Sequence, residues 1–190
     1  MFAKKKEKDI IIHMIVIAGA SASGKTEVAK LLAKKYGICK IITTTTRPMR
    51  KNEVNGRDYF FVSKEEFERK IVAGEFVEFT IYNGNFYGST KDQIGNDKCV
   101  VIDPAGLKSY IALKNDSIVT FFLEADEQTR KKRMEMRGDD REKITSRIKN
   151  DREAFKKENI AKVDYTIDSS FNHSVEEVAD EIYQKYIAKK

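Results

Sequence analysis

Apolar residues along the chain fall into long unbroken runs, separated by segments in which they recur at helical spacing. An unbroken run is typical of a parallel strand that is buried on both faces of a sheet. Three such runs occupy residues 14–18, 99–103 and 117–125. After the first run, helical spacing predicts a helix from Lys25 to Tyr36, which Gly37 would close. The pattern therefore predicts an α/β fold, with a parallel sheet flanked by helices.

The segment between about 45 and 95 follows a different pattern. A polar loop leads into the short strand YFFV, and Ser63 with Glu66 would form a capping box for a helix that ends at Gly74. The stretch EFVEFTIYNGNFYGST that follows is typical of two strands joined by a tight turn near Gly84. These features predict an antiparallel insertion within the parallel core.

The C-terminal half returns to alternating helices and strands. A highly charged helical stretch runs from Asp126 to about Lys157 and is interrupted near Gly138. Short strands are expected at 38–42 and at YTID, residues 165–168. Ser174 and Glu177 would cap the last helix. Its apolar face is expected to pack on the core through Val175, Val178, Ile182 and Tyr186.

Composition supports a single domain and gives only weak information about partners. A chain of 190 residues with 41% apolar content can build one core but is short for two. The net charge of +6 and the pI near 9.1 are compatible with nucleic acid or with small anionic substrates. The charges are dispersed, however, and the one basic cluster, at positions 4–8, is mixed in sign. We therefore expect no nucleic-acid partner, and a dispensable leader at residues 1–9.

The cysteines and the apolar segments bear on the cellular compartment. Cys39 and Cys99 lie in or beside strand-like runs without metal-ligand spacing, which predicts buried, reduced thiols in a cytoplasmic protein. A basic start followed by IIIHMIVIA and ASA also resembles a secretory signal. His13 interrupts that run, and a buried first strand explains the same residues, so the strand is favoured. No apolar stretch approaches the ~20 residues of a membrane helix.

Residues 19–26 read GASASGKT directly after the first strand and fit the pattern G-x-x-x-x-G-K-[ST]. Glycines let backbone N–H groups turn toward phosphate oxygens, and the following helix directs its positive end to the same place. Lys25 would bridge the β- and γ-phosphates of a bound polyphosphate, and Thr26 would ligate Mg²⁺. The alternative is a Gly/Ser-rich turn without a ligand. The predicted polyphosphate site, which the resemblance described below makes the ATP site, comprises Gly19, Ala20, Ser21, Ala22, Ser23, Gly24, Lys25 and Thr26.

The polar loop of the insertion offers a second set of groups that could bind an anion. Arg47 and Arg50 supply two guanidinium forks and Tyr59 a phenol, which together suit a phosphate monoester. Two solvated arginines in a polar loop are the alternative. An insertion beside a phosphate-binding loop indicates a site for a second substrate.

The segment from TTTTRPMR to EFVEF, followed by GNFYGST, resembles the nucleotide-acceptor region of guanylate kinases, and the similarity extends from Met14 to about the end. The resemblance implies transfer of phosphate from ATP to GMP, and to dGMP, for purine nucleotide supply, by a Mg²⁺-dependent monomer or homodimer. It implies that the GMP phosphate is held by Arg47, Arg50, Tyr59 and Tyr87. The guanine would be faced by Thr43, Glu78, Ser89 and Asp103. The transferring phosphoryl group would be surrounded by Lys25, Arg133, Arg137 and Arg147.

The same resemblance implies one guanylate kinase-like domain over residues 1–190. A phosphate-loop core would comprise 14–44 and 97–133, the GMP-binding insertion about 45–95, a helical lid about 134–150, and the C-terminal part of the core 151–190.

The chemistry of guanine agrees with this placement. Its N1–H and N2 amine are adjacent donors that one carboxylate, such as Glu78, can accept together, whereas adenine offers no such pair. Without the resemblance, Glu78 would also fit a solvent-facing position in FVEFT, and Asp103 a turn before Pro104.

Four positions depart from the pattern of guanylate kinases. Val101 replaces an acid and Ala105 a glutamine near the expected Mg²⁺ site, which leaves metal binding and turnover open. Thr43 replaces serine but keeps the hydroxyl, and Asp168 replaces an asparagine near the adenine, which leaves the donor nucleotide open. Two alternatives are a non-catalytic interaction module of the same fold, which would have lost the loop or the lid arginines, and a kinase of another phosphorylated acceptor, which would lack Glu78.

Overall fold

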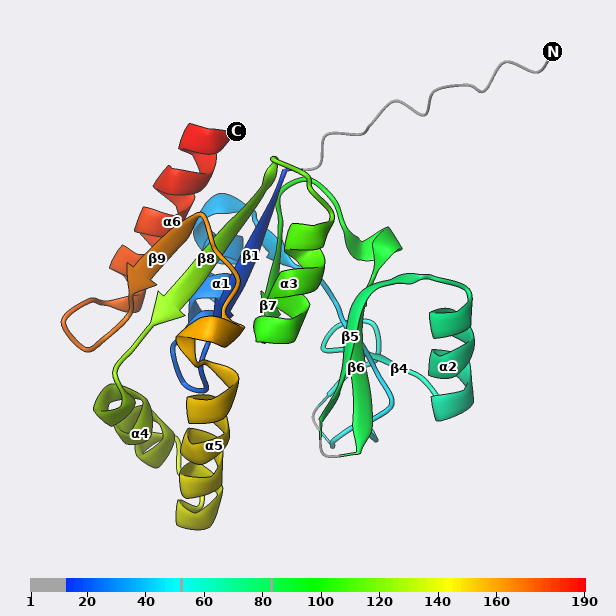
Figure 1. Ribbon diagram of the computed structural model, residues 1–190, viewed down its shortest axis with the longest axis horizontal. Helices are drawn as coiled ribbons and strands as arrows, with labels where there is room; N and C mark the ends of the chain where they lie inside the picture. The colour runs from blue at the N-terminus through cyan, green and yellow to red at the C-terminus, as the bar shows by residue number, and fades with distance from the viewer. Residues whose placement is uncertain (1–12, 52, 83) are drawn as a thin grey trace.

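A computed structural model describes residues 13–51, 53–82 and 84–190, so the expected leader lies outside the described residues. The core is a parallel five-stranded sheet in the order β2-β7-β1-β8-β9 (Figure 1). Its strands are β1 (Met14–Gly19), β2 (Cys39–Lys40), β7 (Lys98–Ile102), β8 (Ile118–Glu124) and β9 (Tyr165–Asp168). Every residue of β1 is buried, because this strand lies in the centre with helices on both faces.

Helices α1 (Lys25–Tyr36), α3 (Pro104–Ala112) and α6 (Val175–Lys189) cover the sheet. Ile15 and Ile17 pack with α1 and α6, whereas Met14 and Val16 of the same strand pack with α3. The expected end of α1 at Gly37 is confirmed, and so is the capping box that begins α6. Successive side chains of β1 thus point to opposite faces of the sheet, and helices cover both faces. The core is a three-layer α/β arrangement, as the sequence predicts.

The edge strand β2 corrects two expectations. It comprises only two residues of the predicted 38–42, and its Cys39 is exposed while Cys99 in β7 is buried. A strand at the border of a sheet has one neighbour only, so the side chain of Cys39 is not enclosed as that of Cys99 is.

The insertion forms a second sheet in the order β4-β3-β6-β5, flanked by α2 (Lys64–Val72). Its strands are β3 (Thr44–Thr45), β4 (Phe60–Phe61), β5 (Phe76–Tyr82) and β6 (Asn85–Thr90). The β5–β6 hairpin is antiparallel as expected, but β4 runs parallel to the unpredicted β3, so the sheet is mixed. Ser63 caps α2 by accepting the Glu66 N–H at 3.1 Å, and the helix ends two residues before Gly74.

Two helices, α4 (Glu127–Met136) and α5 (Arg141–Ala154), project from the carboxyl end of the sheet (Figure 1). The interruption expected near Gly138 is present, with a φ of 79° at this residue. Met134, Ile144 and Ile148 form a small buried cluster against Ala22, which follows β1. The helical pair therefore packs on the loop that leaves the central strand. No helix among the described residues has the length and apolarity to span a bilayer.

Candidate active site

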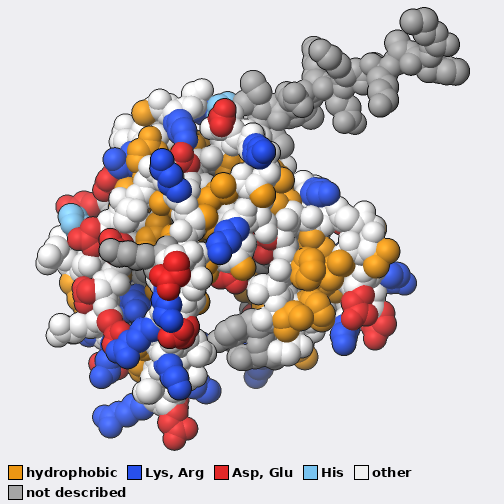
Figure 2. All heavy atoms as spheres, in the orientation of Figure 1, with side chains coloured by type: hydrophobic (Ala, Val, Ile, Leu, Met, Phe, Trp, Pro, Cys, Tyr) orange, Lys and Arg blue, Asp and Glu red, His pale blue; other side chains and the backbone are white. Residues whose placement is uncertain are grey.

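A cavity of about 810 Å³ lies between the carboxyl edge of the parallel sheet, α5 and the second sheet. Figure 2 shows the hollow between the two lobes of the molecule. Residues from three parts of the chain line it: Lys25 and Thr26, then Thr43, Tyr59, Glu78 and Tyr87, then Val101, Asp103 and Arg147. Residues expected to bind ATP and residues expected to bind GMP therefore share one cavity.

The loop after β1 needs its glycines. A Cβ on Gly19 would lie 2.7 Å from the carbonyl oxygen of Leu123, and Gly24 has a φ of 94°, which disfavours a side chain. Lys25 Nζ lies inside the loop, where it donates to the carbonyl oxygens of Gly19 at 2.6 Å and Ala20 at 2.7 Å. Burial lowers the pKa of Lys25 to about 8, although the nearby charge of Asp151 raises it. A polyanion in this loop would hold the ammonium in its charged form.

Thr26, in the first turn of α1, is the candidate metal ligand and lines the cavity. Among the described residues, no group of three His, Cys, Asp or Glu side chains could hold a metal ion. Val101 places an isopropyl group on the cavity wall where the resemblance expects an acid. A single hydroxyl fits an ion such as Mg²⁺, which keeps several waters and is bound largely through substrate phosphates.

The half-buried Glu78 faces the cavity from β5. Its Oε1 accepts a 2.6 Å hydrogen bond from Ser89 Oγ on the adjacent β6. Its Oε2 lies against the first turn of α3, 3.3 Å from the place of a Cβ on Gly106. Burial raises the pKa of Glu78, and the charge of Asp103 adds to this, while the Ser89 hydrogen bond opposes it. Further hydrogen-bond donors, such as those of a bound ligand, would therefore stabilise the ionised Glu78 carboxylate.

Asp103 and Thr43 also line the cavity. Asp103 is the N-cap of α3, because its Oδ1 accepts the Gly106 N–H at 2.8 Å. At the end of β9, Asp168 likewise accepts a backbone N–H, that of Ser170 at 2.9 Å. Both carboxylates thus have local structural partners in addition to any contact with a nucleotide.

Of the four residues expected to bind the acceptor phosphate, two line the cavity and two lie outside its lining. Tyr59 and Tyr87 line the cavity with their rings 6.1 Å apart, and the Arg47 guanidinium lies over Tyr59 at 5.4 Å. Arg47 is paired with Glu53 at 2.7 Å, and Glu53 also accepts the Arg50 N–H at 2.8 Å. The structure does not place Arg47 or Arg50 in the cavity lining. Glu53, which the sequence did not single out, orders this loop.

The three lid arginines do not converge on one point. Arg133 donates to the Ser169 carbonyl oxygen at 2.6 Å, and with Arg137 it lines a neighbouring hollow of about 320 Å³ beside the phosphate loop. Arg147 lines the larger cavity. Asp139 joins the two helices, since it pairs with both Arg137 and Arg147. Sequence reasoning missed this shared counter-ion.

Sequence reasoning also missed a buried ion pair at the loop, Arg130 with Asp151, whose Nη1 and Oδ2 atoms are 2.7 Å apart. A signal was present, because Asp151 follows Ile144 and Ile148 at helical spacing on the buried stripe of α5. It missed Lys40 as well, which lines the cavity beside the Tyr59 ring.

A phosphate-binding loop, a second sheet across the cleft and an arginine-bearing helical pair define a kinase of the P-loop nucleoside monophosphate kinase class. The model of the guanylate kinase family matches residues 12–185. The chain belongs to the guanylate kinase family.

Individual relatives agree with this assignment. The chain is 35% identical to the guanylate kinase of Anaplasma phagocytophilum over 179 residues, which cover 89% of this chain and 83% of that protein. It is 37% identical to the guanylate kinase of Symbiobacterium thermophilum over 132 residues, which cover 66% of this chain and 63% of that protein. The crystal structure of the Anaplasma guanylate kinase superposes with a TM-score of 0.65 at 29% identity, over 94% of this chain and 86% of that one.

Proposed function

We propose that this protein transfers the γ-phosphoryl group of ATP to GMP, and to dGMP, with ADP and GDP or dGDP as products. The observation that carries the proposal is the single cavity lined by Lys25 and Thr26 on one side and by Glu78 on the other. A donor in the loop and an acceptor at the second sheet would meet there. Membership of the guanylate kinase family supports the same reaction.

Guanine recognition rests on Glu78. Its carboxylate accepts a hydrogen bond from the Ser89 hydroxyl, and guanine would add two further donors, N1–H and the N2 amine. Adenine would present an acceptor in place of one of these donors. The site would therefore select guanine over adenine through the free-energy cost of leaving a polar group unpaired. This cost gives a larger discrimination between the two bases than an apolar pocket could achieve. Thr43 and Asp103, in the same cavity, are the proposed further contacts to the base.

Positioning and charge neutralisation supply the catalysis. The acceptor phosphate is itself a nucleophile near neutral pH, so no side chain has to remove a proton. We assign Lys25 to the transferring phosphoryl group because its ammonium is already inside the loop. Arg137 and Arg147 would reach the same group after exchanging the Asp139 carboxylate for phosphate oxygens. Arg133 completes this set, while the acceptor phosphate is assigned to Arg47, Arg50, Tyr59 and Tyr87.

Thr26 would hold Mg²⁺ together with the phosphates of ATP, and the ion would neutralise charge on those phosphates. Because Val101 offers no carboxylate at this place, the protein contributes little to metal affinity. We expect a monomer or homodimer in the cytoplasm, which agrees with two free thiols, Cys39 and Cys99.

A coupled assay of ADP release with GMP, dGMP, AMP, CMP and UMP tests the proposal. We expect turnover with GMP and dGMP and little with the other three nucleotides. Equal turnover with AMP would show that guanine is not selected. ATP binding without transfer to any acceptor would identify a non-catalytic interaction module instead.

A further inference from the structure

We propose that Asp151 is a positioning residue for ATP, which together with Arg130 fixes the first half of the phosphate-binding loop onto helix α5. The inference rests on the proposed function, since it assigns a role in the same donor site. It concerns residues that are 130 positions apart in the sequence, Ser21 and Asp151.

Both carboxylate oxygens of Asp151 contact the loop. The Ser21 N–H donates to Oδ2 at 2.9 Å, and the Ser21 hydroxyl donates to Oδ1 at 3.1 Å. Arg130, from α4, donates to Oδ2 at 2.7 Å and reaches the Ser21 carbonyl oxygen at 3.5 Å. The donor and acceptor groups of Ser21 are therefore all engaged by side chains of α4 and α5.

Stability alone is a poor explanation for this pair. Arg130 is 7% exposed and Asp151 9% exposed, and a buried ion pair contributes stability only when its remaining polar atoms are also satisfied. Arg130 Nε is buried and has no hydrogen-bond partner among the described residues. A costly and incompletely satisfied pair in contact with a phosphate-binding loop favours a role in function.

The pair acts on a loop that is also held at neighbouring residues. Lys25 Nζ binds the carbonyl oxygens of Gly19 and Ala20, and Ala22 packs on the apolar cluster of α4 and α5. Asp151 contacts the residue between these two points. Ser21 N–H is committed to Asp151, and Ser23 N–H donates to the Ala20 carbonyl oxygen at 3.2 Å, so the loop keeps one shape. The N–H groups at the start of α1 remain for phosphate oxygens.

The same contact also locates a lid arginine. Arg147 precedes Asp151 by four residues, so both side chains lie on one face of α5, and both line the large cavity. When Asp151 is bound to the loop, Arg147 is therefore held one helical turn away, over the space between donor and acceptor. The shape of the loop and the position of α5 are thus set together.

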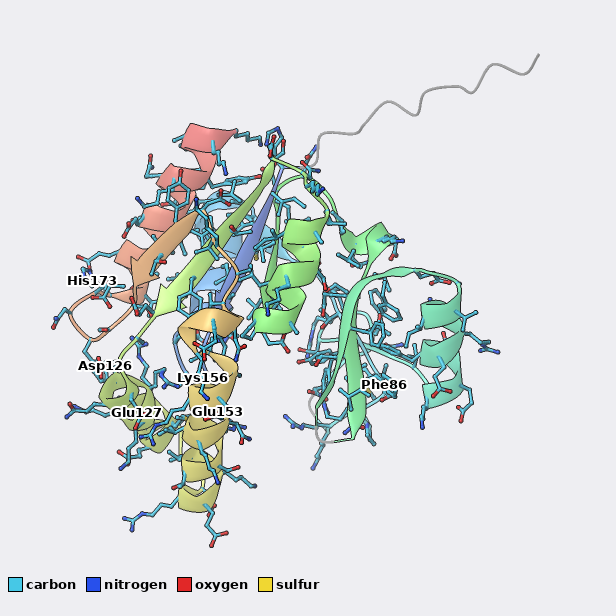
Figure 3. The ribbon with its side chains drawn as sticks, in the orientation of Figure 1. Phe86, Asp126, Glu127, Glu153, Lys156 and His173 are labelled. Atoms are coloured by element: carbon cyan, nitrogen blue, oxygen red, sulfur yellow. The ribbon has the colours of Figure 1, made fainter. Side chains whose placement is uncertain are left out.

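The test compares Asp151→Asn with Glu127→Gln. Glu127 pairs with Arg152 at 2.6 Å, so this control also breaks an ion pair between α4 and α5, but one that is exposed and does not contact the loop. Figure 3 labels Glu127 on α4. For Asp151→Asn we expect the KM for ATP to rise about tenfold or more, while the KM for GMP changes less than about twofold. Glu127→Gln should leave both values unchanged.

Two further measurements keep the inference testable if Asp151→Asn folds poorly. Ser21→Ala removes only the hydroxyl contact, and should raise the KM for ATP about threefold with a smaller loss of Tm than Asp151→Asn, because the ion pair with Arg130 is kept. Arg130→Lys should restore part of the ATP affinity that Arg130→Met loses, because it keeps a cation beside Asp151.

The outcomes separate this inference from the proposed function. The inference would be overturned if Asp151→Asn had a lower Tm and a lower kcat but kept both KM values of the wild type. In that case the Arg130–Asp151 pair would only stabilise the fold. A wild type that transfers phosphate to no acceptor would overturn the proposed function only. In that case calorimetric titration with ATP and Mg²⁺ decides, since Asp151→Asn should still weaken ATP binding about tenfold relative to Glu127→Gln.

Discussion

Replacing Glu78 by glutamine tests guanine recognition with little change in the size of the side chain. The Glu78 carboxylate already accepts from Ser89, and it faces the cavity from β5. Glutamine keeps one acceptor oxygen but presents an amide N–H₂ where the second oxygen was, so at least one guanine donor meets another donor. A hydrogen bond to a charged group contributes about 1.5–3 kcal/mol, and an unmatched buried donor adds a further cost. We therefore expect GMP binding to weaken by about 2–4 kcal/mol, roughly 30- to 900-fold in Kd.

Calorimetric titration with GMP and steady-state kinetics with GMP and AMP measure this effect. The Kd and KM for GMP should rise together, the preference for GMP over AMP should narrow, and the KM for ATP should stay close to that of the wild type. Unchanged GMP binding by Glu78→Gln would refute the assignment of Glu78 to the guanine.

The same substitution has a predictable effect on stability. Because burial raises the pKa of Glu78, the ionised carboxylate lowers the stability of the folded state above that pKa. This cost disappears as the pH falls and the group becomes protonated. Glu78→Gln should therefore raise the Tm relative to the wild type at pH 8, and raise it less at pH 5. In the wild type, the affinity for GMP should fall as the pH is lowered from 8 to 5, because the Glu78 carboxylate becomes protonated. A lower Tm at pH 8 would show that the Ser89 hydrogen bond outweighs the cost of burial.

Four other predictions concern the donor side and the leader. Lys25→Ala should lower kcat by ~10²-fold or more with GMP binding retained, because its charge acts mainly on the transition state; equal losses in binding and kcat would contradict this. Val101→Asp should lower the Mg²⁺ concentration for half-maximal rate at an unchanged KM for GMP, since metal-supporting groups are often worth 10–100-fold; an identical Mg²⁺ profile would mean that another group supplies the support. Asp139→Asn frees Arg137 and Arg147 from their shared carboxylate and should lower the KM for ATP up to about fivefold at low salt. This effect should disappear in 0.5 M salt, where the screening length is on the order of 4–5 Å. A chain that lacks only the expected leader, residues 1–9, should keep the Tm and activity of the full chain, and loss of either would show that the leader packs on the domain. Removing His13 as well should lower the Tm, because its carbonyl oxygen accepts from the Tyr186 hydroxyl at 2.8 Å and from the Asp97 N–H at 3.0 Å.

Much of the fold follows from local sequence. The first strand, the helix from Lys25 to Tyr36 that Gly37 closes, and the capping box at Ser174 are as predicted. Apolar runs, helical periodicity and caps act between residues a few positions apart, so a short window of sequence contains their physical cause. The G-x-x-x-x-G-K-T pattern indicates a phosphate-binding loop for the same reason, because its glycines and lysine act within one turn of chain.

Tertiary structure alone decided which charged groups meet. The partner of Ser21 is Asp151, on a helix 130 residues later, and Arg147 is held by Asp139 rather than standing free. Likewise, Cys39 lies in the largely apolar segment ICKII, which is typical of a strand, but this strand lies at the edge of the sheet and the thiol is exposed. The reason is that a local window sets the backbone and the face of each residue, whereas the partner of a side chain depends on which distant elements the packing of the core brings to the same cleft.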